Sequence, residues 1–205
     1  TRGLAGFVRT LGIFIQGELT SAPWIVRNAT LSVDDRVAIT RPLETMRSRP
    51  LISVLLCVYN TPGIRLQRTI DSVRQQLYPH WELCIVDDAS TFAHVWPILE
   101  EYARFDERIR IVRQPENGHM LDTSNRSLEL ARGQFVALLD PEDELAPHAL
   151  YMIASALEER PLLDFIYSDE DKIDDIGRRF NPYFKPDWNP DLFTAQNIVS
   201  HLVVY

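Results

Sequence analysis

LISVLLCVYN, the stretch from Leu51 to Asn60, is an unbroken apolar run that stops at Thr61-Pro62-Gly63. Its length suits a β-strand, and the Thr-Pro-Gly sequence is typical of a turn. Because apolar and polar residues do not alternate, we expect both faces of this strand to be buried, as in a parallel sheet.

The same succession of strand, turn and helix recurs downstream. Further apolar runs of strand length lie at residues 82–86, 108–112, 134–139 and 163–167. They alternate with stretches of helical periodicity at residues 64–77, 95–102, 120–132 and from 147 onward. Strands that alternate with helices form right-handed βαβ units. We therefore expect an α/β fold with a mostly parallel sheet flanked by helices.

Each helical stretch carries apolar residues on one face, which we expect to point inward. Tyr78-Pro79 is expected to stop the first helix, Gly133 to cap the third, and Pro147 to lie in the first turn of the fourth. Asn125 is expected on the inner face of the third helix. The expected inward residues are Leu66, Ile70, Val73, Leu77, Val95, Ile98, Leu99, Tyr102, Leu121, Leu128, Ala131, Leu150, Ile153 and Leu157.

The N-terminal part is organised differently. Residues 4–15 have helical spacing with a narrow apolar face, and we favour packing on the protein's own domain over a membrane surface. A short strand or helix is expected around residues 31–39. We therefore divide the chain into an extension, residues 1–48, and a domain, residues 49–205.

Bulk composition excludes some classes of function. The chain has 205 residues and an ordinary charged content of 24%, and its net charge of −8 argues against a nucleic-acid partner. The sequence has no Walker lysine loop, no Gly-x-Gly-x-x-Gly after the first strand and no Gly-x-Ser-x-Gly elbow. Its two cysteines, Cys57 and Cys84, lie in apolar runs and are expected to be buried, reduced thiols.

Acidic residues follow three of the predicted strands, at Asp87-Asp88, at Asp140 to Asp143 and at Asp169 to Asp171. Parallel strands end at one edge of a sheet, so these carboxylates are expected to converge there. Converging carboxylates repel one another unless a cation compensates them. A hard divalent cation that bridges to phosphate is the natural partner, and plain solvation of each loop is the alternative.

Single residues near these strand ends have two interpretations each. Asp88 can accept a hydrogen bond from a base or a ribose, or cap the next helix. Trp188 can stack on a sugar ring or pack within its proline-rich loop. His119 and His201 are isolated in the sequence, which favours structural roles for both.

Together these segments resemble a family 2 glycosyltransferase with the GT-A fold. The resemblance covers about residues 49–205 and extends to bacterial members that build O-antigen and other surface polysaccharides. The segments that carry it are residues 50–62, 81–90, 115–119, 135–140, 167–174 and 184–191, the last reading FKPDWNPD.

The resemblance implies inverting transfer of a hexosyl or deoxyhexosyl group from a nucleotide diphosphate donor, of UDP or dTDP type. A glycan or lipid-linked acceptor, Mg²⁺ or Mn²⁺, and a cytoplasmic location, at most peripheral to the inner membrane, are also implied. By motif position, a nucleotide site is expected at Val58, Tyr59, Asn60, Asp88 and Asp140. Asp140 and Glu142 are the implied metal ligands.

Two departures from the family pattern stand out. Asp140-Pro141-Glu142 replaces the usual Asp-x-Asp, and Met120 to Thr123 replaces a run of small residues. The acidic base that the family carries after the segment at Ser200-His201 has no match here, so we expect either a fragment or a chain without turnover. Asp169, Glu170 and Asp171 are weak candidates for the base.

Two other functions remain open at this point. One is a degenerate, non-catalytic module that binds a nucleotide sugar or a partner. The other is a sugar nucleotidyltransferase, for which Asn60-Thr61-Pro62-Gly63 is a poor substitute for the required glycine-rich basic loop.

Overall fold

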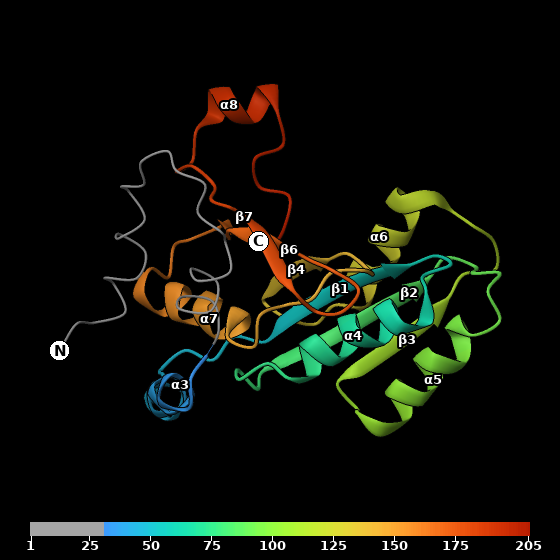
Figure 1. Cartoon of the computed structure of the whole chain (residues 1–205), viewed down its shortest axis with the longest axis horizontal. Helices are drawn as coiled ribbons and strands as arrows, with labels where there is room; N and C mark the ends of the chain where they lie inside the picture. The colour runs from blue at the N-terminus through green and yellow to red at the C-terminus, as the bar shows by residue number, and fades with distance from the viewer. Residues whose placement is uncertain (1–30) are drawn as a thin grey trace.

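The computed structural model describes residues 31–205, and the helix expected at residues 4–15 lies outside the described residues. A six-stranded sheet runs through the molecule in the order β3-β2-β1-β4-β8-β5 (Figure 1). Its strands are β1 (Ile52–Val58), β2 (Trp81–Asp87), β3 (Ile109–Arg113), β4 (Phe135–Leu139), β5 (Ile166–Tyr167) and β8 (Val203–Val204).

The first four strands pair in parallel, as the uninterrupted apolar runs predict. All seven residues of β2 are buried, so this strand is covered on both faces. The short strand β8 is inserted between β4 and β5 and pairs antiparallel with each of them. The strand expected at residues 163–167 shrinks to the two residues of β5.

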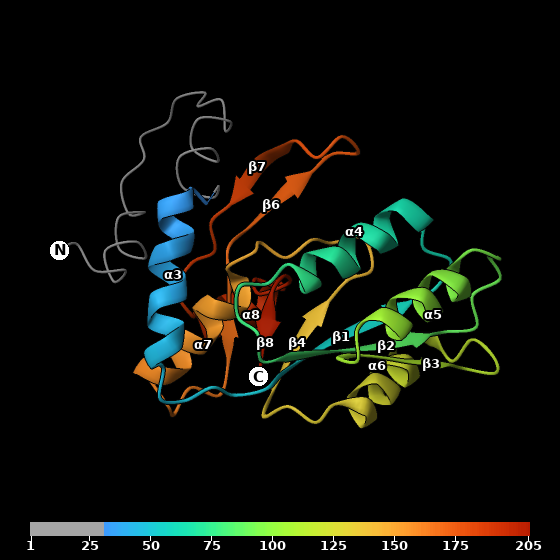
Figure 2. The same cartoon turned by 90° about the horizontal axis from the view of Figure 1, so that it is seen from below.

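Helices cover both faces of the sheet (Figure 2). On one face lie α4 (Gly63–Arg74) and α5 (Val95–Phe105), and on the other lies α6 (His119–Leu130). Nearer β5 and β8 lie α3 (Val33–Thr45) and α7 (Ala149–Glu159). A separate hairpin of β6 (Glu170–Ile173) and β7 (Arg179–Tyr183) and the short α8 (Pro190–Ala195) complete the fold.

Most of the predicted inward faces are confirmed. Leu66, Ile70, Leu99 and Leu150 have no exposed surface and join one core that extends across α4, α5, α7 and the sheet. Helix α4 nevertheless ends at Arg74, before Tyr78-Pro79, and Pro147 precedes α7 instead of lying within it.

The helix predicted at residues 120–132 is present as α6, but the prediction of its inward face was wrong. Leu121 is 72% exposed and Leu128 is 46% exposed, whereas Thr123 and Ser127 are buried against the sheet. Small polar residues at this spacing let the helix approach closely, and the Thr123 hydroxyl both accepts a bond from Gln114 and donates one to the helix backbone. Asn125 is exposed, so it does not lie on the inner face of the helix as we expected.

Gly133 does not cap α6 either, because the C-cap residue is Ala131. The structure gives a different reason for a glycine at this position, which is the close approach of two backbone segments. A Cβ at residue 133 would lie 2.5 Å from the carbonyl oxygen of Leu51 and 2.6 Å from Ser53 Oγ. The glycine therefore lets the start of β4 lie directly against the start of β1.

The described part of the extension, residues 31–48, contains one helix. Helix α3 begins at a capping box in which Ser32 and Asp35 bond reciprocally to each other's backbone, and the short strand or helix expected at residues 31–39 is this helix. Ile39 and Met46 are buried in the same core as the sheet. The boundary between residues 48 and 49 stays a prediction. Both cysteines are free thiols, with Cys84 buried and Cys57 partly exposed.

Candidate functional site

The carboxylates of the first acidic pair, Asp87 and Asp88, link the end of β2 to the end of β3 and to the loop after β3. Asp87 is fully buried, its Oδ1 accepts a bond from Ser90 N at 3.0 Å, and its Oδ2 lies 3.2 Å from Arg113 Nε. Asp88 is 5% exposed, and its Oδ1 accepts bonds from Gly118 N at 2.8 Å and Gln114 Nε2 at 3.0 Å. Both carboxylates therefore brace loops at this edge, whatever else Asp88 does.

The β1 end carries three of the predicted nucleotide-site residues. Val58 is fully buried, and its carbonyl accepts the N–H of Asp88 at 2.8 Å. Tyr59 is 49% exposed. Asn60 has a positive φ of 51°, and its Oδ1 accepts the backbone N–H groups of Thr91 and Phe92. The side chains of Tyr59 and Asn60 thus lie at the surface, whereas that of Val58 belongs to the core.

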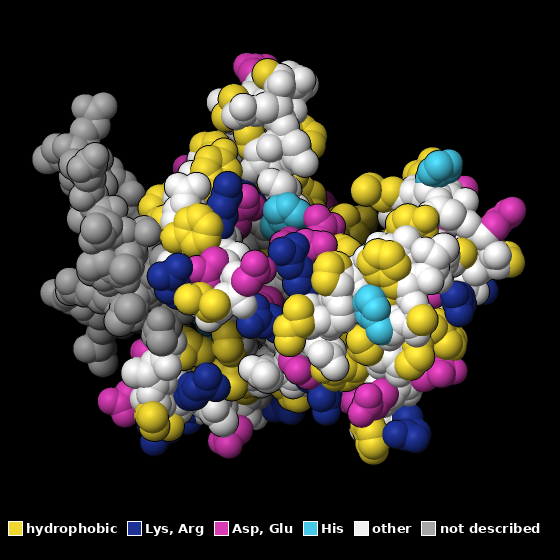
Figure 3. Space-filling view, turned by 45° about the vertical axis from the view of Figure 1, so that its right-hand side comes forward, with side chains coloured by type: hydrophobic (Ala, Val, Ile, Leu, Met, Phe, Trp, Pro, Cys, Tyr) yellow, Lys and Arg dark blue, Asp and Glu magenta, His cyan; other side chains and the backbone are white. Residues whose placement is uncertain are grey.

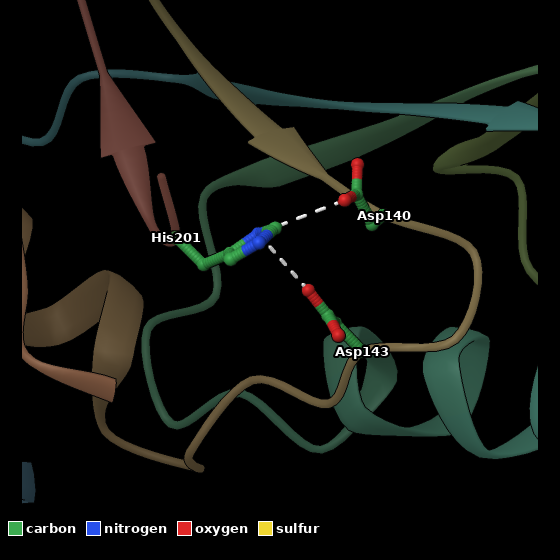
Figure 4. A group of neighbouring side chains, drawn as sticks. All are labelled: Asp140, Asp143 and His201. Carbon is green, nitrogen blue, oxygen red and sulfur yellow. Dashed lines mark ion pairs between the residues drawn. The ribbon is translucent and has the colours of Figure 1, made fainter. Parts of the chain in front are cut away.

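A second group gathers at the end of β4 (Figure 4). His201 Nδ1 lies 3.1 Å from Asp143 Oδ2 and 3.7 Å from Asp140 Oδ2. One ligand atom from each of these residues lies within 4.8 Å of the other two. Two carboxylates and an imidazole that point toward one another form a candidate site for a divalent cation.

The electrostatics of this group favour a cation. Burial raises the pKa of Asp143, the neighbouring carboxylates of Asp140, Glu170 and Glu142 raise it further, and His201 opposes them. The second and third acidic clusters of the sequence therefore do converge, as expected. Burial also raises the pKa of Cys57, with smaller contributions from Asp140 and Asp88 on either side.

Glu142, the second metal ligand implied by the sequence, is engaged elsewhere. Its carboxylate pairs with the guanidinium of Arg65 on α4, which also lies 3.2 Å from Asp175 in the β6–β7 hairpin. Its role as a ligand stays a prediction, and it requires the pair with Arg65 to open.

The third acidic cluster is neutralised by its neighbours. Asp169 accepts the backbone N–H of Lys185 at 2.8 Å, and Glu170 lies 2.9 Å from the Lys185 ammonium. Asp171 pairs with Arg179 at 2.7 Å. Each of the three candidate bases already has a donor or a cation beside it.

A cavity of about 650 Å³ opens beside the second group, between α4, the loop after β4 and the β6–β7 hairpin. Asp143 and His201 line it together with Arg65, Glu142, Glu170 and Asp171. In Figure 3, the segment between β7 and β8 that carries α8 projects from the top of the molecule. Charged side chains and a histidine gather at the foot of this segment, next to a hollow in the surface. Val58, Tyr59, Asn60 and Asp88 are not part of this cavity lining.

His201 is the site residue that sequence reasoning missed. It precedes β8, whose Val203 pairs with Leu138 of β4 in an antiparallel register. Residues just before β8 therefore lie beside the residues just after β4. No local pattern in the sequence signals this, because the pairing joins residues far apart in the chain through a strand of two residues.

Comparisons with known proteins place this chain in one family. Residues 53–205 match the model described as glycosyl transferase family 2. An uncharacterized protein of Sinorhizobium fredii, y4gI, is 46% identical over 163 residues, which are 80% of this chain and 18% of that protein. The O-antigen biosynthesis protein RfbC of Myxococcus xanthus is 41% identical over 156 residues, or 76% of this chain and 12% of that protein.

A solved structure shares the fold. The S. aureus TarS structure of residues 1–349 superposes with a TM-score of 0.54 at 26% identity, covering 62% of this chain and 37% of that one. This likeness confirms the predicted GT-A arrangement of a mostly parallel sheet between helices. The chain spans less than a fifth of the two curated relatives. Among the described residues, the helices are all too short or too polar to cross a membrane.

Proposed function

The chain belongs to glycosyl transferase family 2, and from this premise we propose that it forms the donor-binding part of a metal-dependent glycosyltransferase. The donor is a nucleoside diphosphate sugar of UDP or dTDP type, and the acceptor is a hydroxyl of a glycan or of a lipid-linked glycan. Transfer proceeds with inversion. The observation that carries the proposal is the convergence of Asp140, Asp143 and His201 at the end of β4.

The donor set of this group fits Mn²⁺ or Mg²⁺. Carboxylate oxygens suit both ions, whereas an imidazole nitrogen is a better ligand for a transition metal than for Mg²⁺. We therefore expect Mn²⁺ to bind more tightly. When bound, the ion supplies positive charge to the departing diphosphate.

The remaining residues bind and orient the donor. Asn60 ties the loop after β1 to the loop after β2, Asp88 holds the loop after β3, and together these loops shape the edge where the nucleoside is expected. Tyr59 offers an exposed ring there for contact with a base. Asp140 stands at the end of β4, next in the sheet to β1, so the nucleoside edge and the metal group lie on adjacent strands.

The acceptor hydroxyl requires a general base. Asp169, Glu170 and Asp171 remain predictions for this role. Each of them already has a partner, Lys185 or Arg179, and would have to leave that partner to accept a proton from the acceptor hydroxyl.

The test is calorimetric titration of UDP and dTDP into the protein with Mn²⁺ and again with EDTA. We expect binding that requires Mn²⁺ and that weakens by about tenfold or more in Asp143→Asn. Glu101→Gln, an exposed carboxylate on α5, is the matched control and should bind as the unaltered protein does. Glu142→Gln tests whether Glu142, the ligand expected from the sequence, also binds the metal. A loss of nucleotide affinity equal to that in Asp143→Asn would make Glu142 a ligand.

One observation favours a second candidate, a non-catalytic binding module. The Arg65 pair occupies the carboxylate that replaces the second aspartate of the family motif. Nucleotide binding that is equal in Mn²⁺ and EDTA, or no binding in either, would overturn the metal-dependent proposal and favour this module.

A further inference from the structure

The side chain of Lys185 is 1% exposed, although it carries a full positive charge. Its ammonium donates hydrogen bonds to the carbonyl oxygens of His201 and of Val199, the latter at 3.1 Å, and lies 2.9 Å from Glu170 Oε2. An ammonium has three protons to donate, and three oxygens surround this one. Two carbonyl oxygens and the charge of one carboxylate therefore offset the burial of the ammonium.

These bonds join the two ends of the segment between β7 and β8, which carries α8. After β7 the chain runs out to α8 and then returns to β8 (Figure 1). Lys185 lies on the outgoing segment, and Val199 and His201 lie on the returning one. The backbone N–H of Lys185 adds a bond to Asp169 Oδ1 at 2.8 Å. One side chain thus joins both segments and the start of the β6–β7 hairpin.

The position of His201 depends on this junction more than on the sheet. His201 lies outside β8, which has only two residues, and the nearest backbone bond to the neighbouring strand is made by the next residue, Leu202, whose carbonyl accepts the N–H of Ser168 at 3.2 Å. The backbone carbonyl of His201 is bonded to Lys185 on one side, while its ring lies 3.1 Å from Asp143 on the other. Ser168 Oγ provides a second tie by accepting the N–H of Leu202 at 3.2 Å.

A purely stabilising role would not explain a lysine here. A buried ion pair can often be replaced by apolar residues without loss of stability. Lysine is also rare in this chain, where the only other one is Lys172 and the remaining basic residues are arginines. A compact ammonium can converge on two carbonyls and a carboxylate, whereas the planar fork of arginine is suited to bidentate partners.

We propose that Lys185 is a positioning residue for the candidate metal group. Its ammonium fixes the backbone at His201, which keeps the imidazole within ligand distance of Asp140 and Asp143. This inference rests on the proposed function, and it extends the site to a residue that reaches the metal only through His201.

The test compares Lys185→Met with Lys172→Met, a matched control because Lys172 is an exposed residue of β6 whose charge also borders the cavity. Methionine keeps an unbranched stem and removes all three donors. Mn²⁺ affinity is measured by counting free Mn²⁺ in electron paramagnetic resonance spectra, and urea unfolding is followed in parallel. We expect Lys185→Met to bind Mn²⁺ about 10–100-fold more weakly than the unaltered protein, the range typical for partners of metal ligands. Lys172→Met should bind within about twofold of it.

A folded Lys185→Met variant with unchanged Mn²⁺ affinity would overturn the positioning role. If Lys185→Met does not fold, Ser168→Ala removes the second tie beside His201, and it should weaken Mn²⁺ binding by about threefold or more; no change would count against the proposal.

Failure of the proposed function gives a different result. If the unaltered protein binds no Mn²⁺, the metal-dependent function fails, and the positioning role is then judged without metal. In histidine-labelled protein, the ring signals of His201 should move in Lys185→Met and stay in place in Lys172→Met. Unmoved ring signals in Lys185→Met would refute the positioning role independently of the metal.

Discussion

Asn60 offers a quantitative test of how the nucleoside edge is built. It lies at the end of β1 with a φ of 51°, in the left-handed region. Its Oδ1 accepts hydrogen bonds from Thr91 N at 2.8 Å, Phe92 N at 3.0 Å and Thr91 Oγ1 at 3.2 Å. Its own N–H donates to Ser90 Oγ at 2.9 Å. One residue therefore ties the loop after β1 to the loop after β2.

Three substitutions distinguish the contribution of the Asn60 side-chain oxygen to stability from that of its left-handed backbone conformation. Asn60→Asp keeps a side-chain acceptor and tolerates the positive φ, so we expect a change within about 0.5 kcal/mol. Asn60→Gly keeps the φ and loses the acceptor. Each lost bond is worth about 0.5–1.5 kcal/mol, and water replaces part of it at this exposed edge. With the extra chain entropy of glycine, about 2 kcal/mol is expected. Asn60→Ala loses the same bonds and adds about 1–2 kcal/mol for the left-handed backbone, or about 3 kcal/mol in total.

The assay is urea unfolding followed by tryptophan fluorescence, with the free energy of unfolding extrapolated to water. UDP affinity, measured in Mn²⁺, should fall in the same order, since the two loops shape the proposed nucleoside site. Equal destabilisation by Asn60→Asp and Asn60→Ala would refute the reasoning, because the side-chain oxygen would then contribute nothing. Equal stability of the glycine and alanine variants would show that the backbone strain is overestimated.

Three further predictions concern stability. Gly133→Ala places a Cβ 2.5 Å from a backbone carbonyl, and we expect a loss of about 1–3 kcal/mol in urea unfolding. Leu150→Ala, at a fully buried position, should cost about 2–5 kcal/mol by the same measurement, and a loss below about 1 kcal/mol would contradict the packing described here. Burial raises the pKa of Tyr78 from 10.0 to about 12, so its neutral form stabilises the fold fully below pH 10, and roughly 2–3 kcal/mol is lost as the pH rises through 12. Tyr78→Phe, which removes the ionisable hydroxyl, should flatten this alkaline loss relative to the unaltered protein.

Much of the fold follows from the sequence because its signals are local. The apolar runs that form β1 and β2 are buried on both faces, and this burial removes the alternation that a half-exposed strand would show. The apolar run at residues 163–167 does predict a strand where β5 lies, but no local pattern shows that β5 and β8 pair antiparallel at this edge, because that pairing joins distant segments. Local pattern therefore predicts the parallel half of the sheet and misses its antiparallel edge.

Helix α6 shows a second limit. Its leucines suggested an apolar inner face, but the buried positions are Thr123 and Ser127. Hydrophobic periodicity assumes that the buried face is the apolar one. Here the helix approaches the ends of β1 and β2, where small hydroxyl side chains fit and can bond to Gln114 and to the helix backbone. A prediction based on hydropathy alone therefore places Leu121 on the buried face, although this side chain is exposed.

The candidate site shows what the sequence can and cannot distinguish among acidic residues. Asp87, Asp169 and Asp171 follow strands just as Asp140 does, and a sequence cannot rank them. In the structure, Arg113 pairs with Asp87, Arg179 pairs with Asp171, and the backbone of Lys185 bonds to Asp169.

Their partners decide which carboxylates are available to a ligand. Among the described residues, the ionic partner of both Asp140 and Asp143 is His201, a side chain that can exchange a proton for a metal ion. An arginine has no such option, because its guanidinium stays charged and cannot act as a ligand. Carboxylates paired with arginine are therefore committed to the fold, whereas carboxylates that share a histidine can accept a cation without breaking an ion pair to a permanent charge. By this criterion the metal group consists of Asp140, Asp143 and His201, and Glu142 can join it only if a ligand draws Arg65 away.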